Sequence, residues 1–266
     1  MAISAAIHSL DMVGRRVNGG IAGLGRFTWF LGGTLTHLVS QSLRGRAESV
    51  IHHIWIMGVL GTPSAVLSLA FLTAVLIYEL AFHLRLIVPQ DAMIPSFTSL
   101  LVLRELGAVV TAMLLGSRVG AAITAEIATM KSTRQLDALE LCGVNLIDFL
   151  VVPRVLGCVI ASVCLTCLAT GGALLITAFT TSQSLGLTPR FFLTHLFLFA
   201  EPGDLTICVV KGALFGLTIP IVACFRGLNA SSGSEGVGSA STRTVVENSV
   251  LVILLDFLVS WLWYAI

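Results

Sequence analysis

Long apolar runs separated by short polar segments dominate this chain. Five runs reach the roughly 20 mostly apolar residues that a helix needs to cross a bilayer. They cover about 54–80, 94–125, 147–180, 205–225 and 245–266. The pattern predicts an all-α integral membrane protein with about five transmembrane helices in a domain that spans 51–266.

The N-terminal segment, 1–50, has a different pattern. Over 20–45, aromatic and apolar side chains are interspersed with basic ones: Phe27, Trp29, Phe30 and Leu31 with Arg26, Arg44 and Arg46. Such a mixture is typical of an amphipathic helix that lies in the membrane interface. A sixth span over the same residues is the competing interpretation.

Composition supports the membrane class. The chain is 56% hydrophobic and 11% charged, with a mean hydropathy of +0.97, whereas soluble domains are about 25% charged. The net charge is +1 and no basic block occurs, so composition gives no support for a nucleic-acid partner. The Cys164-x-x-Cys167 pair lies inside an apolar run and is interpreted as packing, and we expect neither a metal site nor catalytic residues.

The basic residues of the loops predict the orientation. If the N-terminus is cytoplasmic, Arg85 and Arg190 face outside and nine basic residues face the cytoplasm, which is the expected excess. The nine are Arg15, Arg16, Arg26, Arg44, Arg46, Lys131, Arg134, Arg226 and Arg243. The C-terminus then lies outside, and the segment 181–203 forms a short outer helix. The Gly- and Ser-rich segment 229–241 is predicted to be a flexible cytoplasmic loop.

One segment between the second and third runs reads like a soluble helix: "AEIATMKSTRQLDALELCG", residues 125–143. Ser132 and Gln135 have the spacing of a capping box, and Gly143 is placed to end a helix in the left-handed conformation. We therefore predict a short cytoplasmic helix over about 132–143, with Asn145 capping the next helix. It is either a solvated loop helix or the docking site of a partner.

The two faces of this short helix differ in character. Leu136 and Leu139 lie on one face with Gly143, and Arg134, Asp137 and Glu140 lie on another. The chain has no G-x-x-x-x-G-K-[ST] phosphate-binding loop. If ATP drives the protein, another chain must bind it.

Several charged residues fall inside the apolar runs, where charge is costly unless it is paired or hydrated. Four of them lie at similar depth and are expected to meet: Arg104, Glu105, Lys211 and Asp256. They form either a structural ion-pair network or a polar element of a transport cavity. Arg118 lies nearer the cytoplasmic end and is expected to reach the interface or to pair with Asp148 or Glu126.

Small residues recur at every fourth position on the second run. They are Ala112, Gly116, Gly120, Thr124 and Ala128, and the fourth run repeats the spacing with Gly212 and Gly216. This pattern allows close approach of helix backbones. It predicts a central position for the second helix.

These features resemble those of the MlaE/YrbE permeases, the membrane subunits of ABC transporters that work with MCE proteins in lipid trafficking. The resemblance rests mainly on residues 103–156, "LRELGAVVTAMLLGSRVGAAITAEIATMKSTRQLDALELCGVNLIDFLVVPRVL". It extends through "VVKGALFG" at 209–216, "TRTVVENSV" at 242–250 and "LLDFLVS" at 254–260.

The resemblance implies a homodimer that moves phospholipid or a similar hydrophobic molecule. It implies cytoplasmic ATPase subunits that bind ATP and Mg²⁺, and an MCE-domain protein on the outer face. The cavity charges would be Arg104, Glu105, Lys211 and Asp256, with Arg118 nearby and Arg243 as a cytoplasmic loop arginine. ATPase coupling would involve Glu126, Lys131, Ser132, Arg134, Gln135, Leu136, Asp137, Leu139, Glu140 and Gly143.

Two positions depart from the family pattern. Ala108 stands where the family usually has proline, so a softer kink is expected there. Arg134 stands where the family usually has glutamate. A basic residue thus replaces an acidic one at the expected ATPase contact.

Two other classes compete with this interpretation: an ion- or proton-coupled secondary transporter that uses the intramembrane charges, and a non-transporting scaffold. The expected location is a bacterial inner membrane, and the inner envelope of an organelle of bacterial descent fits equally well.

Overall fold

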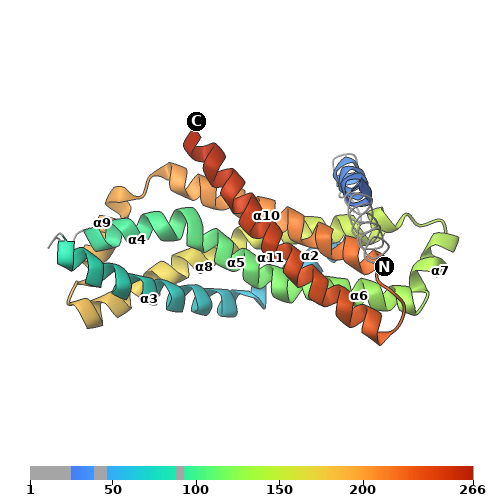
Figure 1. Ribbon diagram of the computed structural model, residues 1–266, viewed down its shortest axis with the longest axis horizontal. Helices are drawn as coiled ribbons and strands as arrows, with labels where there is room; N and C mark the ends of the chain where they lie inside the picture. The colour runs from blue at the N-terminus through green and yellow to red at the C-terminus, as the bar shows by residue number, and fades with distance from the viewer. Residues whose placement is uncertain (1–24, 39–46, 88–92, 266) are drawn as a thin grey trace, which may run out of the picture. The chain divides into compact units, whose positions relative to one another are not determined.

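The computed structural model describes residues 25–38, 47–87 and 93–265 (Figure 1). All described elements are helices, which confirms the all-α class. The chain divides into two units, Met1–Ser42 and Leu43–Ile266, each described by itself. In the first unit, the described residues 25–38 are helical. The predicted ends of this segment, at 20 and 45, lie outside the described residues.

The second unit contains the five predicted spans. Among the described residues, five helical segments have the length and apolar composition to cross a membrane: Glu48–Leu84, Met93–Ser132, Ile147–Gln183, Pro202–Leu228 and Ser234–Ala265. The five-span prediction is confirmed. All five segments are longer than the sequence predicted, because polar residues at their ends continue the helix beyond the apolar run.

The first two spans are not continuous α-helix. The first consists of α2 (Ala47–Ile54), the π-helical turn η1 (Trp55–Val59) and α3 (Thr62–Ile87). The second contains two π-helical turns, and its elements are α4 (Met93–Leu101), η2 (Val102–Leu106), α5 (Gly107–Leu115), η3 (Gly116–Gly120) and α6 (Ala121–Ser132). Such turns insert one extra residue and loosen the local hydrogen-bond ladder, and they occur frequently at functional sites.

The remaining spans complete the bundle. The third is η4 (Ile147–Val151) with α8 (Val152–Leu185), the fourth is α10 (Pro202–Leu228) and the fifth is α11 (Ser234–Ala265). Within this unit α8 packs against α3 and α10, and α10 packs against α6 and α11. The short helices α7 (Gln135–Leu141) and α9 (Pro189–Phe199) lie at opposite ends of the bundle, and α11 runs obliquely along it (Figure 1).

The loop predicted over 229–241 is too long, because α11 begins at Ser234 and only 229–233 lie outside a helix. Hydroxyl groups in the first turns of α11 bond to carbonyl groups of the same helix. Ser241 Oγ donates to the Val237 carbonyl at 3.0 Å, and Thr242 Oγ1 donates to the Gly238 carbonyl at 3.0 Å. Serine and threonine are weak helix formers partly because they compete for backbone groups, and here that competition is resolved within the helix.

Small residues bring the backbones of the central helices close together. A Cβ added at Gly216 would lie 2.9 Å from the Cys158 carbonyl oxygen and 2.9 Å from the Val159 Cα, which are backbone atoms of α8. A Cβ at Gly120 would lie 2.6 Å from Nδ2 of Asn248 on α11. The second span therefore packs against α11, and α10 packs against α8, at distances that larger residues would not permit.

Hydroxyl groups join the same helices where the small residues allow approach. Thr124 Oγ1 lies 2.8 Å from Thr244 Oγ1 and donates to the Ala223 carbonyl at 3.0 Å. All three residues are buried, and they link α6, α10 and α11. In an apolar surrounding, such contacts satisfy polar groups that have no water to bind.

Candidate functional site

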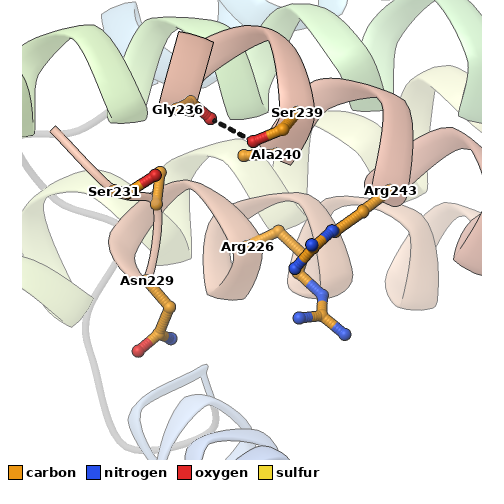
Figure 2. A pocket seen from close by; sticks show the side chains of 8 residues that line it. Arg226, Asn229, Ser231, Gly236, Ser239, Ala240 and Arg243 are labelled. Atoms are coloured by element: carbon orange, nitrogen blue, oxygen red, sulfur yellow. Dashed lines mark hydrogen bonds between the residues drawn. The ribbon is translucent and has the colours of Figure 1, made fainter. Parts of the chain in front are cut away.

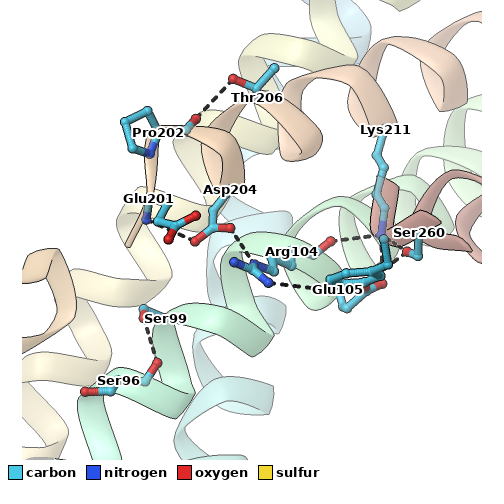
Figure 3. A network of polar contacts seen from close by, with 11 residues as sticks. Ser96, Ser99, Arg104, Glu105, Glu201, Pro202, Asp204, Thr206, Lys211 and Ser260 are labelled. Atoms are coloured by element: carbon cyan, nitrogen blue, oxygen red, sulfur yellow. Dashed lines mark hydrogen bonds and ion pairs between the residues drawn. The ribbon is translucent and has the colours of Figure 1, made fainter. Parts of the chain in front are cut away.

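Lys211 is the centre of a charged network inside the bundle. Its side chain is fully buried, and Nζ lies 2.7 Å from Glu105 Oε2 on the second span and 2.7 Å from Asp256 Oδ1 on the fifth. Nζ also donates to Ser260 Oγ at 2.7 Å and to the Arg104 carbonyl oxygen at 2.9 Å (Figure 3). The Asp256 contact is an ion pair without a directed hydrogen bond. Lys211 thus joins three helices.

The π-helical turn η2 contains the residues that meet Lys211. Both Arg104 and Glu105 lie within Val102–Leu106, and the Arg104 carbonyl accepts a hydrogen bond from a side chain. A regular α-helix directs that carbonyl to the amide four residues later. The loosened ladder of the turn is the physical reason that a backbone oxygen can contribute to the network.

Arg104 does not pair with the acids that the sequence suggested. Its guanidinium forms an ion pair with Asp204 in the first turn of α10, and its Nη1 donates to the Tyr264 hydroxyl at 3.4 Å. Asp204 is 1% exposed. The expected balance of two positive and two negative charges is therefore wrong, since Asp204 adds a third carboxylate.

Asp204 has a second role in the local structure. Its Oδ2 accepts from the Glu201 amide at 3.1 Å, as one half of a capping box that starts α10 (Figure 3). Sequence reasoning missed this residue because it lies at the end of an apolar run. The spacing Glu201-Pro-Gly-Asp204, with proline in the first helical position, was the available signal.

The Arg104 side chain is 22% exposed, unlike the Lys211 side chain, which is fully buried. Glu105 is also partly exposed, at 34%, and its Oε1 accepts from Ser260 Oγ at 3.0 Å. The network is therefore closed around Lys211 and open at both Arg104 and Glu105. A positive charge at its open edge can attract an anionic group.

Arg118 lies in the second π-helical turn, η3, and its Nη1 donates to the Leu60 carbonyl oxygen at 3.0 Å. The suggested pairing with Glu126 is wrong. The Glu126 carboxylate instead accepts from Arg154 Nη2 at 2.7 Å, and Arg154 is 4% exposed. This buried arginine, which sequence reasoning missed, ties α6 to α8.

The short helix begins differently from the prediction. Ser132 is the last residue of α6, and α7 runs over Gln135–Leu141. The predicted capping box is wrong, because Arg134 is the residue before α7 and has left-handed backbone angles, with φ 59°. Arg134 thus makes the tight turn that allows α6 to end and α7 to start within two residues.

The end of the short helix agrees with the sequence. Gly143 has φ +75°. Its amide donates to the Glu140 carbonyl at 2.9 Å, and the Val144 amide donates to the Leu139 carbonyl at 3.1 Å. These two bonds form a Schellman motif. Asn145 then caps the next helix by accepting from the Ile147 amide at 3.0 Å.

The apolar residues of α7 divide into two groups. Leu136 is 5% exposed, so its side chain packs within the chain and cannot contact a partner. Leu139 is half-buried, whereas Leu141 is 90% exposed. Asp137 and Glu140 are also exposed. The surface that α7 presents is therefore made by Leu141 and two acids rather than by Leu136.

Lys131 fixes the last turn of α6. Its Nζ donates to the Leu228 carbonyl oxygen at 2.7 Å, at the C-terminal end of α10. A lysine at a helix C-terminus satisfies a carbonyl that has no intrahelical partner. α6 is therefore held against both α8 and α10 at the point where α7 begins.

Comparison with known proteins assigns the chain to a family. Residues 50–262 match the family described as Permease MlaE. The chain belongs to the MlaE permease family. The match covers all five spans except the first residues of α2 and the last residues of α11, and it includes the four described π-helical turns, α7 and the Lys211 network.

Relatives of this MlaE-family chain are named as transporter subunits. It is 28% identical over 260 residues to a probable ABC transporter permease protein of Rickettsia bellii, over 98% of this chain and 99% of the relative. It is 32% identical over 225 residues to the probable ABC transporter permease protein ycf63 of Porphyra purpurea, over 81% and 84%. A relative from a Synechocystis strain, probable ABC transporter permease protein slr1045, is 38% identical over 170 residues, which span 62% of this chain and 63% of the relative.

Membership of the MlaE family decides between the competing classes. An ABC transporter permease depends on ATPase subunits, so the secondary transporter and the scaffold are set aside. The chain is a multi-pass membrane protein and the permease subunit of such a transporter. The two departures from the family pattern now have positions in the structure: Ala108 is buried in the first turn of α5, and Arg134 forms the exposed turn before α7.

Proposed function

We propose that this permease moves phospholipid or a similar hydrophobic molecule between the membrane and a conduit formed by an MCE-domain protein. It acts as a homodimer, and separate ATPase subunits bind ATP and Mg²⁺. The N-terminus lies in the cytoplasm and the C-terminus outside, in a bacterial inner membrane or the inner envelope of an organelle. The observation that carries the proposal is Arg104, a partly exposed charge on a buried network within an apolar bundle.

Arg104 is suited to the headgroup of an anionic lipid. A guanidinium binds phosphate oxygens in a bidentate manner, and the acyl chains would lie along apolar helix faces. Asp204 pairs with the guanidinium in the structure. A lipid phosphate that enters the site competes with Asp204 for the Arg104 guanidinium. The positive charge of Arg104 is therefore neutralised both before and after the phosphate binds.

The α7 surface is suited to the ATPase. Its exposed Leu141 offers an apolar contact, and Asp137 and Glu140 offer charges at its edge. Hydrogen bonds and an ion pair at Lys131 and Glu126 hold α6 against its neighbours, so force on α7 acts on the second span.

Asp204→Asn tests the headgroup site, because it should increase the amount of bound anionic lipid and not decrease it. The amide keeps an oxygen for the Glu201 amide but no longer neutralises Arg104. We expect the purified Asp204→Asn chain to retain more anionic phospholipid than the parent, measured by mass spectrometry of extracted lipid. Arg104→Gln should retain about tenfold less, which is the effect of losing one charge-assisted contact.

Arg190→Gln provides the matched control, because Arg190 is an exposed arginine in the first turn of α9 and is not part of the network. It should leave lipid retention unchanged. Equal retention by the parent, Asp204→Asn and Arg104→Gln chains would refute the headgroup site. Transport itself is measured by lipid transfer from vesicles that contain the chain, its ATPase and its MCE partner, with and without ATP.

A further inference from the structure

A polar pocket lies at the end of the bundle that carries α7, far from the Lys211 network. It has a volume of about 190 Å³ and lies between the last turn of α10 and the first turns of α11 (Figure 2). Arg226 on α10 and Arg243 on α11 both line it, and Asn229, Ser231 and Ser239 complete its polar wall. Fifteen residues of α10 separate Lys211 from Arg226, which corresponds to about 22 Å along the helix.

The two arginines give the pocket an excess of positive charge. Arg226 uses one edge of its guanidinium on Glu247, with Nε 2.6 Å from Oε2 and Nη2 paired to Oε1. Its Nη1 group has no part in this pair. Arg243 is exposed, and no acid in the described part of the chain forms an ion pair with it. The pocket is therefore lined by two guanidinium groups, of which only that of Arg226 is paired with a carboxylate in the described part of the chain.

The arginine side chains also extend toward the same region of the pocket (Figure 2). Two like charges that converge in this way repel each other unless an anion lies between them. The N–H groups of Arg243 and the free edge of Arg226 provide more donors than the two oxygens of one carboxylate can accept.

Close packing around Gly236 fixes the shape of the pocket. A Cβ at Gly236 would lie 2.0 Å from the Ser231 carbonyl oxygen, so only glycine lets the 229–233 turn fold against α11. The side chains of Ala230 and Ala240 are buried and pack with Ala128 of α6. The pocket therefore has a closely packed floor of small residues, and charged side chains line it as well.

We propose that this pocket binds a phosphate group. A phosphate ester carries up to two negative charges and three acceptor oxygens, which matches two converging guanidinium groups better than a carboxylate does. The volume equals that of about six water molecules in the liquid, which is sufficient for one hydrated phosphate group. The group belongs to free phosphate or to a lipid of the adjacent membrane leaflet. This site is independent of the function proposed above.

The test uses the full-length chain in neutral detergent micelles. Inorganic phosphate is titrated by calorimetry at constant ionic strength, with chloride as the replaced anion. In a parallel arm, native mass spectrometry counts phosphatidic acid retained from mixed micelles, with phosphatidylcholine as the reference lipid. Arg243→Gln removes the unpaired guanidinium from an exposed position, so the fold is not at risk. Arg190→Gln is the matched control.

Two outcomes support the proposal and differ in the source of the phosphate. If free phosphate binds and Arg243→Gln weakens it about tenfold, the ligand is a soluble phosphate. If only phosphatidic acid is retained, and Arg243→Gln reduces that retention about tenfold, the ligand is a lipid headgroup. The proposal is overturned if Arg243→Gln changes neither measurement, or if Arg190→Gln weakens both to the same extent.

Discussion

Replacement of Lys211 by methionine tests whether the buried network stabilises the bundle. Methionine keeps an unbranched side chain of similar length but removes the charge that contacts Glu105, Asp256 and Ser260 within 2.7 Å. Two carboxylates then face each other without a cation in a largely apolar surrounding. Breaking a buried ion pair by removing one partner costs about 3–5 kcal/mol.

That cost is a large fraction of the stability of a typical protein, about 5–15 kcal/mol. The free energy of unfolding is measured by titration of the purified chain in mixed micelles with dodecyl sulfate, followed by circular dichroism. A compensated variant separates unpaired charge from lost packing. Adding Glu105→Gln and Asp256→Asn to Lys211→Met removes both carboxylates, and we expect it to recover at least about half of the lost free energy.

Two results would contradict this reasoning about Lys211. One is a Lys211→Met variant whose free energy of unfolding lies within about 1 kcal/mol of the parent, the range of an exposed ion pair. The other is a compensated variant no more stable than Lys211→Met alone. In that case the loss comes from packing and hydrogen bonds, and the charges are not the cause.

The remaining predictions concern helix packing and the docking surface. Gly216→Ala should destabilise the chain by about 1–3 kcal/mol in the same titration, because its Cβ meets α8 backbone atoms at 2.9 Å. Gly238→Ala is the control, since it meets no atom within 4 Å and should stabilise by up to about 1 kcal/mol. Leu141→Asp should reduce co-purification of the ATPase without a change in thermal midpoint. Leu136→Asp should lower that midpoint because the side chain is buried, and equal effects of the two substitutions would contradict this division of α7.

The sequence predicted features that depend on composition and local spacing. Long apolar runs are sufficient to place five spans, since each span must satisfy its own backbone hydrogen bonds in the bilayer. Gly143 and Asn145 were placed correctly because helix ends follow local rules. Lys211, Glu105 and Asp256 were expected to meet, because charge inside a membrane requires a partner.

Other features could not be predicted because they depend on tertiary contacts or on neighbouring turns. The pairing of Arg104 with Asp204 requires the start of α10 to lie beside η2. Nothing in the local pattern indicates a π-helical turn, since one inserted residue leaves the apolar run unchanged. The left-handed Arg134 was missed because Ser132 and Gln135 fit a capping box, and the longer α6 prevailed over that local preference.

The positions of the three charges along the chain have a consequence for membrane insertion. Polypeptides are made from the N-terminus, so Glu105 on the second span is in the bilayer before Lys211 on the fourth. A lysine at the centre of a span costs about 2.5–3.5 kcal/mol during insertion. Glu105 is already present to offset that cost when α10 enters, whereas Asp256 arrives with the last span. The order of synthesis thus supplies one counter-ion in advance and leaves the other to complete the bundle.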